Sequence, residues 1–326
     1  MLGVDAMERT PALIGVNAPY VRGQYGHDLA PNGRFPDWPV EFDPMYAYRP
    51  IAEAAWLGFR AIRVWLCENA EGIVGDVEGV HPDLLEAIRV IQDGAALNGM
   101  RVYWTVLDGN AVVREGDPIT RAILVDSETR KRFVHNVLRP IAETLDPEIT
   151  FALEIINEPE TATPECFDAA EKRAPGAEPV QWDDIGATLR ACADAVDQHV
   201  LTAGTMHVFL DRLWRVEPAL RAIDVHVYHR DGGLPSKRDL ADYVGDDALL
   251  ELPLIAGECG IPKDPGPREP LSFCNFIHNA DALDYAAAFL WQLRGDLIDV
   301  QVEQRPPTRL AWDVKRVLAE RAPDEG

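Results

Sequence analysis

The stretch Leu153-Glu-Ile-Ile-Asn-Glu-Pro159 is an apolar run that ends in two polar residues and a proline. Isoleucine favours β-strands, and Pro159 has no N–H to donate to a sheet, so a predicted strand stops just after Glu158. The stretch Leu254-Ile-Ala-Gly-Glu-Cys-Gly260 has the same form and carries Glu258 near its end. Each of these predicted strands therefore places a glutamate at or near its carboxyl end.

Eight short apolar runs recur along the chain, and longer stretches with helical periodicity separate most of them. The predicted strands cover residues 12–17, 61–66, 101–107, 150–156, 199–205, 222–228, 253–258 and 286–293. The clearest predicted helices cover residues 44–57, 82–97, 127–145, 183–197 and 309–321, and weaker helical patterns lie at 211–216 and 236–244. Strands that alternate with helices predict a parallel sheet, and near-continuous apolar strands predict burial on both of its faces.

The number of strand and helix units predicts the fold class. An α/β barrel of eight units runs to roughly 250 residues before loop insertions, which the length of this chain accommodates. The rival, a doubly wound open sheet, usually has a glycine-rich phosphate turn after its first strand, and Gly15-Val-Asn-Ala-Pro19 is not one. We therefore predict an α/β fold, a single (β/α)8 TIM barrel domain over residues 1–326, with long βα loops at 164–179 and 262–270.

The charge of the chain excludes some partners. The chain carries 31 basic and 54 acidic residues, a net charge of −23. It should repel phosphate backbones and anionic membrane surfaces, so neither nucleic acid nor a membrane is expected as a partner. No stretch approaches the roughly 18 apolar residues of a membrane-spanning helix. Residues 1–11 lack the regions of a secretory signal, so we expect a cytoplasmic protein, or a secreted one if a leader was removed.

The cysteines and histidines have no spacing that is typical of metal sites. The five cysteines include no CxxC pair, and the eight histidines include no HExxH motif. An odd number of cysteines also argues against a disulfide framework. We therefore expect neither a metal nor another cofactor.

The two glutamates belong to the fourth and seventh predicted strands. In a (β/α)8 barrel the active site lies at the carboxyl ends of the strands, and strands four and seven lie opposite each other across its mouth. The carboxyls of Glu158 and Glu258 can then approach one bound group from opposite sides. Glycoside hydrolysis needs two carboxyl groups in this arrangement.

On these motifs the chain resembles clan A glycoside hydrolases, and most closely glycoside hydrolase family 5, the cellulase and mannanase family. Asn157-Glu158-Pro159, preceded by Glu154, is similar to the family's acid/base strand, and Glu258-Cys259-Gly260 is similar to its nucleophile pattern. The resemblance implies a retaining hydrolase of β-glycosidic bonds, such as an endo-β-1,4-glucanase, a mannanase or a related β-glycosidase. Glu158 would be the acid/base and Glu258 the nucleophile of a double displacement.

The resemblance also implies supporting residues around the pair. Arg63 is similar to the family arginine that pairs with the nucleophile, and we expect it to lower the pKa of Glu258. His226 and Tyr228 are similar to the family's His-x-Tyr, in which Tyr228 would hydrogen-bond Glu258. Trp291 is similar to the tryptophan beneath the sugar at the cleavage point, where a flat ring matches the apolar face of a pyranose.

The implied mechanism sets two requirements. The carboxyl groups should lie about 5–5.5 Å apart, and Glu158 must start protonated, which requires surroundings that raise its pKa. Asn157 would hydrogen-bond the sugar 2-hydroxyl. The chain departs from the family at the third strand, where Leu107-Asp-Gly-Asn110 stands in place of a histidine. Asp108 or Asn110 would then bind the sugar hydroxyls, and neighbouring clan A families stay open.

Two other functions fit a barrel of this kind. A carbohydrate-binding barrel that has lost catalysis would bind without hydrolysis, although this chain keeps both glutamates. A different (β/α)8 enzyme, such as a metal-dependent hydrolase or lyase, would lose its activity on chelation. The expected partner in the leading interpretation is a carbohydrate or glycoconjugate substrate. The sugar, the linkage, endo or exo cleavage and the oligomeric state are left open by the motifs.

Overall fold

Eight parallel strands close into a barrel in the computed structural model, which describes residues 10–19, 28–36, 43–167, 173–217, 220–262, 271–298 and 307–321. Around the barrel the strands follow the order β1-β10-β9-β8-β7-β6-β5-β2, and β1 closes the circle by pairing with both β10 and β2. The strands are β1 (Leu13–Ala18), β2 (Ala61–Trp65), β5 (Arg101–Asp108), β6 (Thr150–Asn157), β7 (Leu201–Met206), β8 (Ile223–Tyr228), β9 (Leu254–Gly260) and β10 (Ala287–Leu290). The predicted (β/α)8 barrel is confirmed, and the open sheet is excluded.

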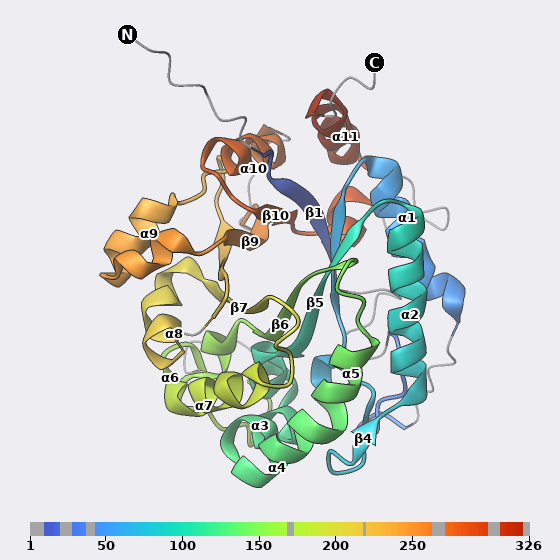
Figure 1. Ribbon diagram of the computed structural model, residues 1–326, viewed down its shortest axis with the longest axis vertical. Helices are drawn as coiled ribbons and strands as arrows, with labels where there is room; N and C mark the ends of the chain where they lie inside the picture. Colours follow the sequence, from blue (N-terminus) through green and yellow to red (C-terminus); the bar gives the residue numbers. More distant parts are fainter. Residues whose placement is uncertain are drawn as a thin grey trace.

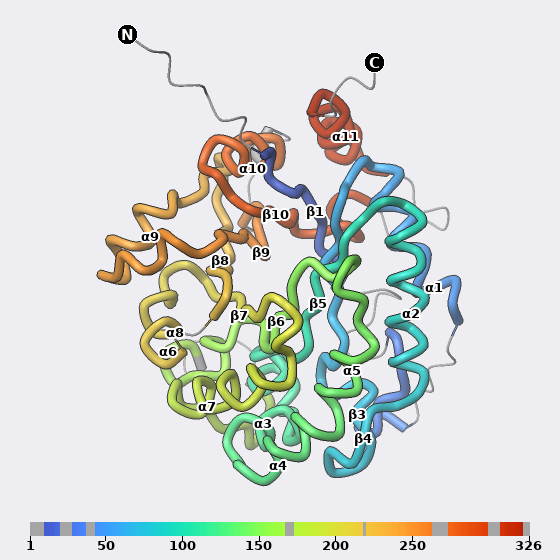
Figure 2. Tube along the Cα trace, viewed as in Figure 1, coloured from blue at the N-terminus to red at the C-terminus, as the bar shows by residue number. Residues whose placement is uncertain are grey.

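Helices surround the barrel in the order of the sequence, from α1 and α2 on one side to α9 on the other (Figures 1 and 2). They are α1 (Pro44–Leu57), α2 (Pro82–Leu97), α3 (Pro118–Val125), α4 (Ser127–Arg132), α5 (Arg139–Thr144), α6 (Pro164–Phe167), α7 (Trp182–Ala193), α8 (Leu210–Val216), α9 (Lys237–Val244), α10 (Leu271–Ala282) and α11 (Arg309–Arg321). None of the helices in the described part of the chain is long and apolar enough to cross a membrane.

Helix ends follow from local sequence signals. Helix α1 begins with Asp43, whose side chain accepts a hydrogen bond from Met45 N, and with Pro44 in the first turn. It ends at Gly58, whose φ of 96° lies in the left-handed region that favours glycine. Helix α9 begins with a capping box between Ser236 and Asp239. The predicted bounds of α1, α2 and α11 agree with the structure.

Three predicted features need correction. The predicted helix 127–145 is divided into α4, a π-helical segment at Phe133–Leu138, and α5. Helices α3 and α10 and the small hairpin of β3 (Ile73–Val74) and β4 (Gly79–Val80) were not predicted. Helix α10 buries residues such as Phe273, Phe276 and Ile277 on one face and exposes Asn275 and His278 on the other. The expected loop at 164–179 contains α6, and residues 168–172 and 263–270 of the two expected loops lie outside the described residues.

The interior of the barrel changes character from one end to the other. Toward the amino ends of the strands it is filled by an apolar cluster in which Tyr103 and Phe289 have ring centroids 5.3 Å apart. One step further along β2 and β6 the interior holds the fully buried ion pair of Arg63 and Glu154. The carboxyl ends of the strands therefore carry polar side chains above a packed apolar layer, as in a barrel with its site at this end.

Candidate active site

Two β-bulges bring Glu258 and Asn157 into the mouth of the barrel. Asp224 of β8 pairs with Ile255 of β9, but the register then shifts so that His226 pairs with Glu258 instead of Gly257. A second shift lies between Glu154 and the end of β6. Because successive strand residues point to opposite faces, each one-residue shift moves the following side chain to the other face. Regular strands would have directed Glu258 outward.

Glu158 follows β6 directly and adopts an uncommon backbone conformation. Its φ of 43° and ψ of 56° lie in the left-handed region, and the 3₁₀ helix η4 (Pro159–Ala162) begins after it. Its N–H donates to Gly204 O at 2.8 Å, and its carbonyl accepts from Thr161 N at 3.0 Å and from Thr161 Oγ1 at 2.7 Å. These hydrogen bonds hold the strained backbone of Glu158 in place, so its side chain starts from a fixed position at the barrel mouth.

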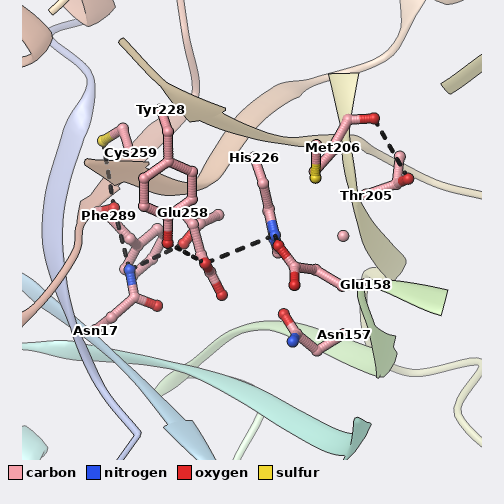
Figure 3. A network of polar contacts seen from close by, with 12 residues as sticks. Asn17, Asn157, Glu158, Thr205, Met206, His226, Tyr228, Glu258, Cys259 and Phe289 are labelled. Carbon is pink, nitrogen blue, oxygen red and sulfur yellow. Dashed lines mark hydrogen bonds and ion pairs between the residues drawn. The ribbon is translucent and has the colours of Figure 1, made fainter. Parts of the chain in front are cut away.

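The two glutamates meet at His226 (Figure 3). A carboxylate oxygen of Glu158, one of Glu258 and a ring nitrogen of His226 all lie within 4.8 Å of one another. His226 Nδ1 is 3.1 Å from Glu158 Oε1 and 3.8 Å from Glu258 Oε2. Tyr228, two residues further along β8, donates to Glu258 Oε2 at 2.7 Å. An oxygen separation of at most 4.8 Å is close to the about 5–5.5 Å between the carboxyl groups of retaining glycosidases and below the roughly 6.5–9.5 Å of inverting ones.

Arg63 lies beneath the pair and is fully buried. Its Nη1 donates to Glu258 Oε1 at 2.8 Å and its Nη2 to Glu154 Oε2 at 2.5 Å. It also donates to the side-chain oxygens of Asn157 at 2.7 Å and Asn17 at 3.0 Å. One cation thus compensates two buried carboxylates and fixes two amides, which makes the floor of the site rigid.

Glu154 has a buried hydrogen-bonding role in this floor. Besides Arg63, its carboxylate accepts from Thr105 Oγ1 at 2.6 Å and from Gly204 N at 2.8 Å. Every oxygen of Glu154 therefore has a protein donor. The partners Asn17 and Thr105 were not singled out from the sequence. Asn17 ends the first predicted strand and is the residue of β1 that pairs with Arg63 of β2 in the sheet.

Asp108 and Asn110 stand where the third strand ends. Asp108 Oδ1 accepts from Asn157 Nδ2 at 3.0 Å and from Asn110 N at 3.0 Å. Asn110 Nδ2 donates to Glu158 Oε2 at 3.1 Å. Both residues line the cavity described below, and they also orient Asn157 and Glu158 from the side opposite to Arg63 and His226.

The site opens into a cavity of about 470 Å³. Trp291, directly after β10, and Trp65 of β2 form one wall, with ring centroids 5.9 Å apart at 77°. The helix η1 (Glu68–Ala70) and the π-helical turn η2 (Ala111–Glu115) add residues that the sequence did not single out. The described residues that line the cavity are Pro19, Trp65, Glu68, Asp108, Asn110, Arg114, Glu115, Asn157, Glu158, Tyr228, Glu258 and Trp291.

The pKa values of the pair run opposite to the expectation from the sequence. Burial raises the pKa of Glu258 and outweighs the charges of His226 and Arg63, which lower it. Burial also acts to raise the pKa of Glu158, but the hydrogen bond and charge of His226 bring it below its ordinary value. Burial lowers the pKa of His226, yet the charge of Glu258 and the bond to Glu158 raise it to about 10. These directions favour a proton on His226 over one on Glu158 at neutral pH.

Two groups of side chains have donor atoms close enough to be considered for a metal ion. Among the described residues they are Glu158, His226 and Glu258, and Glu154, Asp224 and His226. A cation at either group would compete with Arg63, whose guanidinium already binds Glu154 and Glu258. It would also displace the donors that these carboxylates already have. The chemistry of the donor set therefore fits a proton-transfer site better than a metal site.

Gly204 has no side chain, and the space that a Cβ would take there is filled by the ring of His226 and the carboxylate of Glu154. A Cβ at this position would lie under 3.0 Å from both His226 Nε2 and Glu154 Oε1. Gly204→Ala is therefore expected to cost about 1–3 kcal/mol of unfolding free energy by overpacking and to lower activity by displacing His226. Chemical denaturation measures the first effect. Gly79→Ala is the control, because a Cβ there meets nothing within 4 Å, and equal stability of the two variants would contradict the expectation.

The fold and the two facing carboxyls define a (β/α)8 barrel with a dicarboxylate site at the carboxyl ends of its strands. Solved structures of mannanases have this fold. A β-mannanase from the blue mussel Mytilus edulis superimposes with a TM-score of 0.66 at 16% identity, over 98% of this chain and 94% of that one. The β-1,4-mannanase of the sea hare Aplysia kurodai gives 0.68 at 14% identity, over 95% and 93%.

A further neighbour is a variant of a GH5_18 protein from Streptomyces cattleya, solved in complex with Manb1-4GlcNAc, with a TM-score of 0.69 at 16% identity over 97% of this chain and 82% of that one. The resemblance to glycoside hydrolase family 5 is thus confirmed at the level of the fold. No protein-family model matches the chain, and no curated protein sequence matches it.

Proposed function

We propose that the chain is an O-glycosyl hydrolase, one catalytic domain that cleaves β-glycosidic bonds with retention of configuration. The observation that carries this proposal is the approach of a Glu158 oxygen and a Glu258 oxygen to within 4.8 Å at the mouth of the barrel. At this separation one carboxylate can reach the anomeric carbon while the other reaches the glycosidic oxygen. The fold shared with mannanases supports the same class of reaction.

In the proposed first step Glu258 attacks the anomeric carbon. Its Oε1 is held by Arg63 and its Oε2 by Tyr228, so the attacking carboxylate has a fixed direction. Burial raises the energy of its charged form, and covalent bond formation removes that charge. Asn157, held by Arg63 and Asp108, keeps one amide hydrogen for a sugar 2-hydroxyl.

Glu158 acts as acid and then as base in this proposal. The proton moves from His226 Nδ1 to Glu158 Oε1 along their 3.1 Å contact and then to the leaving oxygen as the glycosidic bond breaks. In the second step Glu158 accepts a proton from the water that attacks the glycosyl intermediate, and the proton returns to His226. The cycle consumes one water and leaves all the side chains as they began.

A neutral β-linked sugar chain is the substrate class that we propose. Arg114 is the one basic residue among the described residues that line the cavity, which also include Glu68, Asp108 and Glu115 besides the catalytic pair. Such walls disfavour uronate or sulfated chains. The Trp65 and Trp291 rings offer apolar faces for pyranose stacking. A β-1,4-mannan is the first candidate, and a glycoconjugate with a Man-β-1,4-GlcNAc unit is the second, because the Streptomyces neighbour was solved with that disaccharide.

Hydrolysis of a panel of β-1,4-mannan, β-1,4-glucan, Man-β-1,4-GlcNAc and aryl β-glycosides tests the proposal. We expect cleavage of at least one neutral β-linked substrate, with the β-anomer appearing first in NMR spectra recorded during the reaction. Initial release of the α-anomer would contradict the retaining mechanism. Binding without cleavage would favour the carbohydrate-binding barrel, and loss of activity on chelation would favour a metal-dependent enzyme.

A further inference from the structure

His226 has a second edge that the proposed mechanism does not use. Its Nδ1 meets the two glutamates, while its Nε2 is buried and has no hydrogen-bond partner in the described structure. A buried ring nitrogen without a partner requires an explanation. The charged groups that face His226 are Arg63 of β2, Glu154 of β6, Glu158 at its end, Glu160 of η4, Glu258 of β9 and Asp224 of its own strand.

Asp224 lies two residues before His226 and on the same face of β8. It is fully buried, and its Oδ1 accepts from Gly257 N at 2.8 Å while its Oδ2 accepts from the hydroxyl of Tyr103. One oxygen of Asp224, one of Glu154 and a ring nitrogen of His226 lie within 4.8 Å of one another. Two donors thus fix the carboxyl of Asp224 beneath the histidine ring.

The two carboxylates below His226 differ in how their charge is compensated. Glu154 is bound directly by the guanidinium of Arg63. Asp224 forms no ion pair with a lysine or arginine in the described ranges, and of the charges around it that of His226 has the largest effect on its pKa. A positive charge on His226 and a negative charge on Asp224 therefore stabilise each other in an interior where charges interact strongly.

We propose that Asp224 is a positioning residue that keeps His226 protonated and so keeps a proton available to Glu158. The part of this inference that concerns catalysis, the supply of a proton to Glu158, rests on the proposed function. The effect of Asp224 on the charge of His226 holds whether or not the protein turns over a glycoside. Asp224 does not line the cavity, and in this proposal it acts on the reaction through the ring of His226.

The titration of the groups agrees with this arrangement. Burial raises the pKa of Asp224, which the charge of His226 and other interactions limit to about 6. Since the coupling between two sites is reciprocal, the ionised Asp224 must raise the pKa of His226 in turn. Above about pH 6 Asp224 is then charged, which is the range in which an isolated histidine would lose its proton.

The test is NMR of nitrogen-labelled imidazole rings in the full chain as a function of pH, with the signal of His226 assigned from its loss in His226→Gln. In Asp224→Asn, which keeps the shape of the side chain, we expect the midpoint of the His226 titration to fall by one pH unit or more. That shift is a tenfold or larger loss in proton affinity. Tyr103→Phe is the matched control, because it removes a hydrogen bond to Asp224 but leaves the charge.

The pH profile of kcat/KM gives a second readout on whichever substrate is cleaved. Its alkaline limb should move to lower pH in Asp224→Asn in step with the NMR midpoint. A folded Asp224→Asn protein in which the midpoint of the His226 titration is unchanged overturns the inference. A His226 ring that is neutral at about pH 7 in the wild-type protein also overturns it, and this outcome can be seen without any variant. If no glycoside is hydrolysed, the NMR result still decides the role of Asp224 and only the proposed function fails.

Discussion

Glu258→Gln is expected to reduce turnover by about three orders of magnitude or more while the protein stays folded. Glutamine keeps the volume of the side chain but cannot form the glycosyl ester that the proposed mechanism requires. The amide can still accept from the hydroxyl of Tyr228, and Arg63 keeps its ion pair with Glu154. The loss should therefore lie in kcat, measured as initial rates on the best substrate of the panel, with a melting temperature close to that of the wild type.

The matched control is Glu86→Gln on α2. Glu86 has a half-exposed side chain that pairs only with Arg89, one turn away on the same helix, so its loss should change neither rate nor stability measurably. A Glu258→Gln protein that keeps more than about a tenth of the wild-type rate would remove Glu258 from the nucleophile role. A protein that fails to fold would assign it a structural role instead.

The barrel could be predicted because its strands are buried on both faces and its helices are two-faced. Each of the eight predicted strands is present, with bounds that differ by at most three residues. Helix α10 was not predicted because it follows the proline-rich stretch 262–270 and its exposed face carries uncharged residues such as Asn275 and His278, so its polar face contrasts little with its buried one. The β3–β4 hairpin has two residues in each strand, which is too short for alternation to be visible.

Both strand-end glutamates could be recognised from the sequence, but the direction of Glu258 could not be derived from alternation. Ile255 points into the barrel, so strict alternation would have turned Glu258 toward the helices. The bulge between Asp224 and His226 on one strand and Ile255 and Glu258 on the next corrects this. Such shifts depend on contacts between strands far apart in the chain, which no local pattern encodes.

The protonation states of the site residues could not be predicted from the sequence either. The motifs suggested an ionised nucleophile and a protonated acid, whereas in the structure the surroundings raise the pKa of His226 to about 10 and also raise the pKa of Glu258. The difference arises because several buried groups share one small volume, and each group sets the pKa of its neighbours. Burial together with the distances among Arg63, His226 and the carboxylates sets these pKa values, and both follow only from the folded structure.

Arg63→Met is expected to destabilise the fold by about 3–5 kcal/mol, because it leaves the buried Glu154 without its ion pair and removes one of the two cations beside Glu258. Arg63 is fully buried and binds Glu154 and Glu258 at 2.5 and 2.8 Å, so water cannot replace it. Equilibrium denaturation measures the loss. Arg89→Met on α2 is the control, since Arg89 is half-exposed and should change the free energy of unfolding by less than about 0.5 kcal/mol.

The dependence on pH separates this electrostatic cause from a packing defect. The charge of Arg63 lowers the pKa of Glu258, which burial has already raised, so the variant raises this pKa further. A carboxyl whose pKa is higher in the folded than in the unfolded state loses stability as pH rises between the two values. The deficit of Arg63→Met should therefore shrink as the pH is lowered toward the ordinary pKa of glutamate. A deficit that is equal at all pH values would instead reflect the lost packing of the arginine side chain.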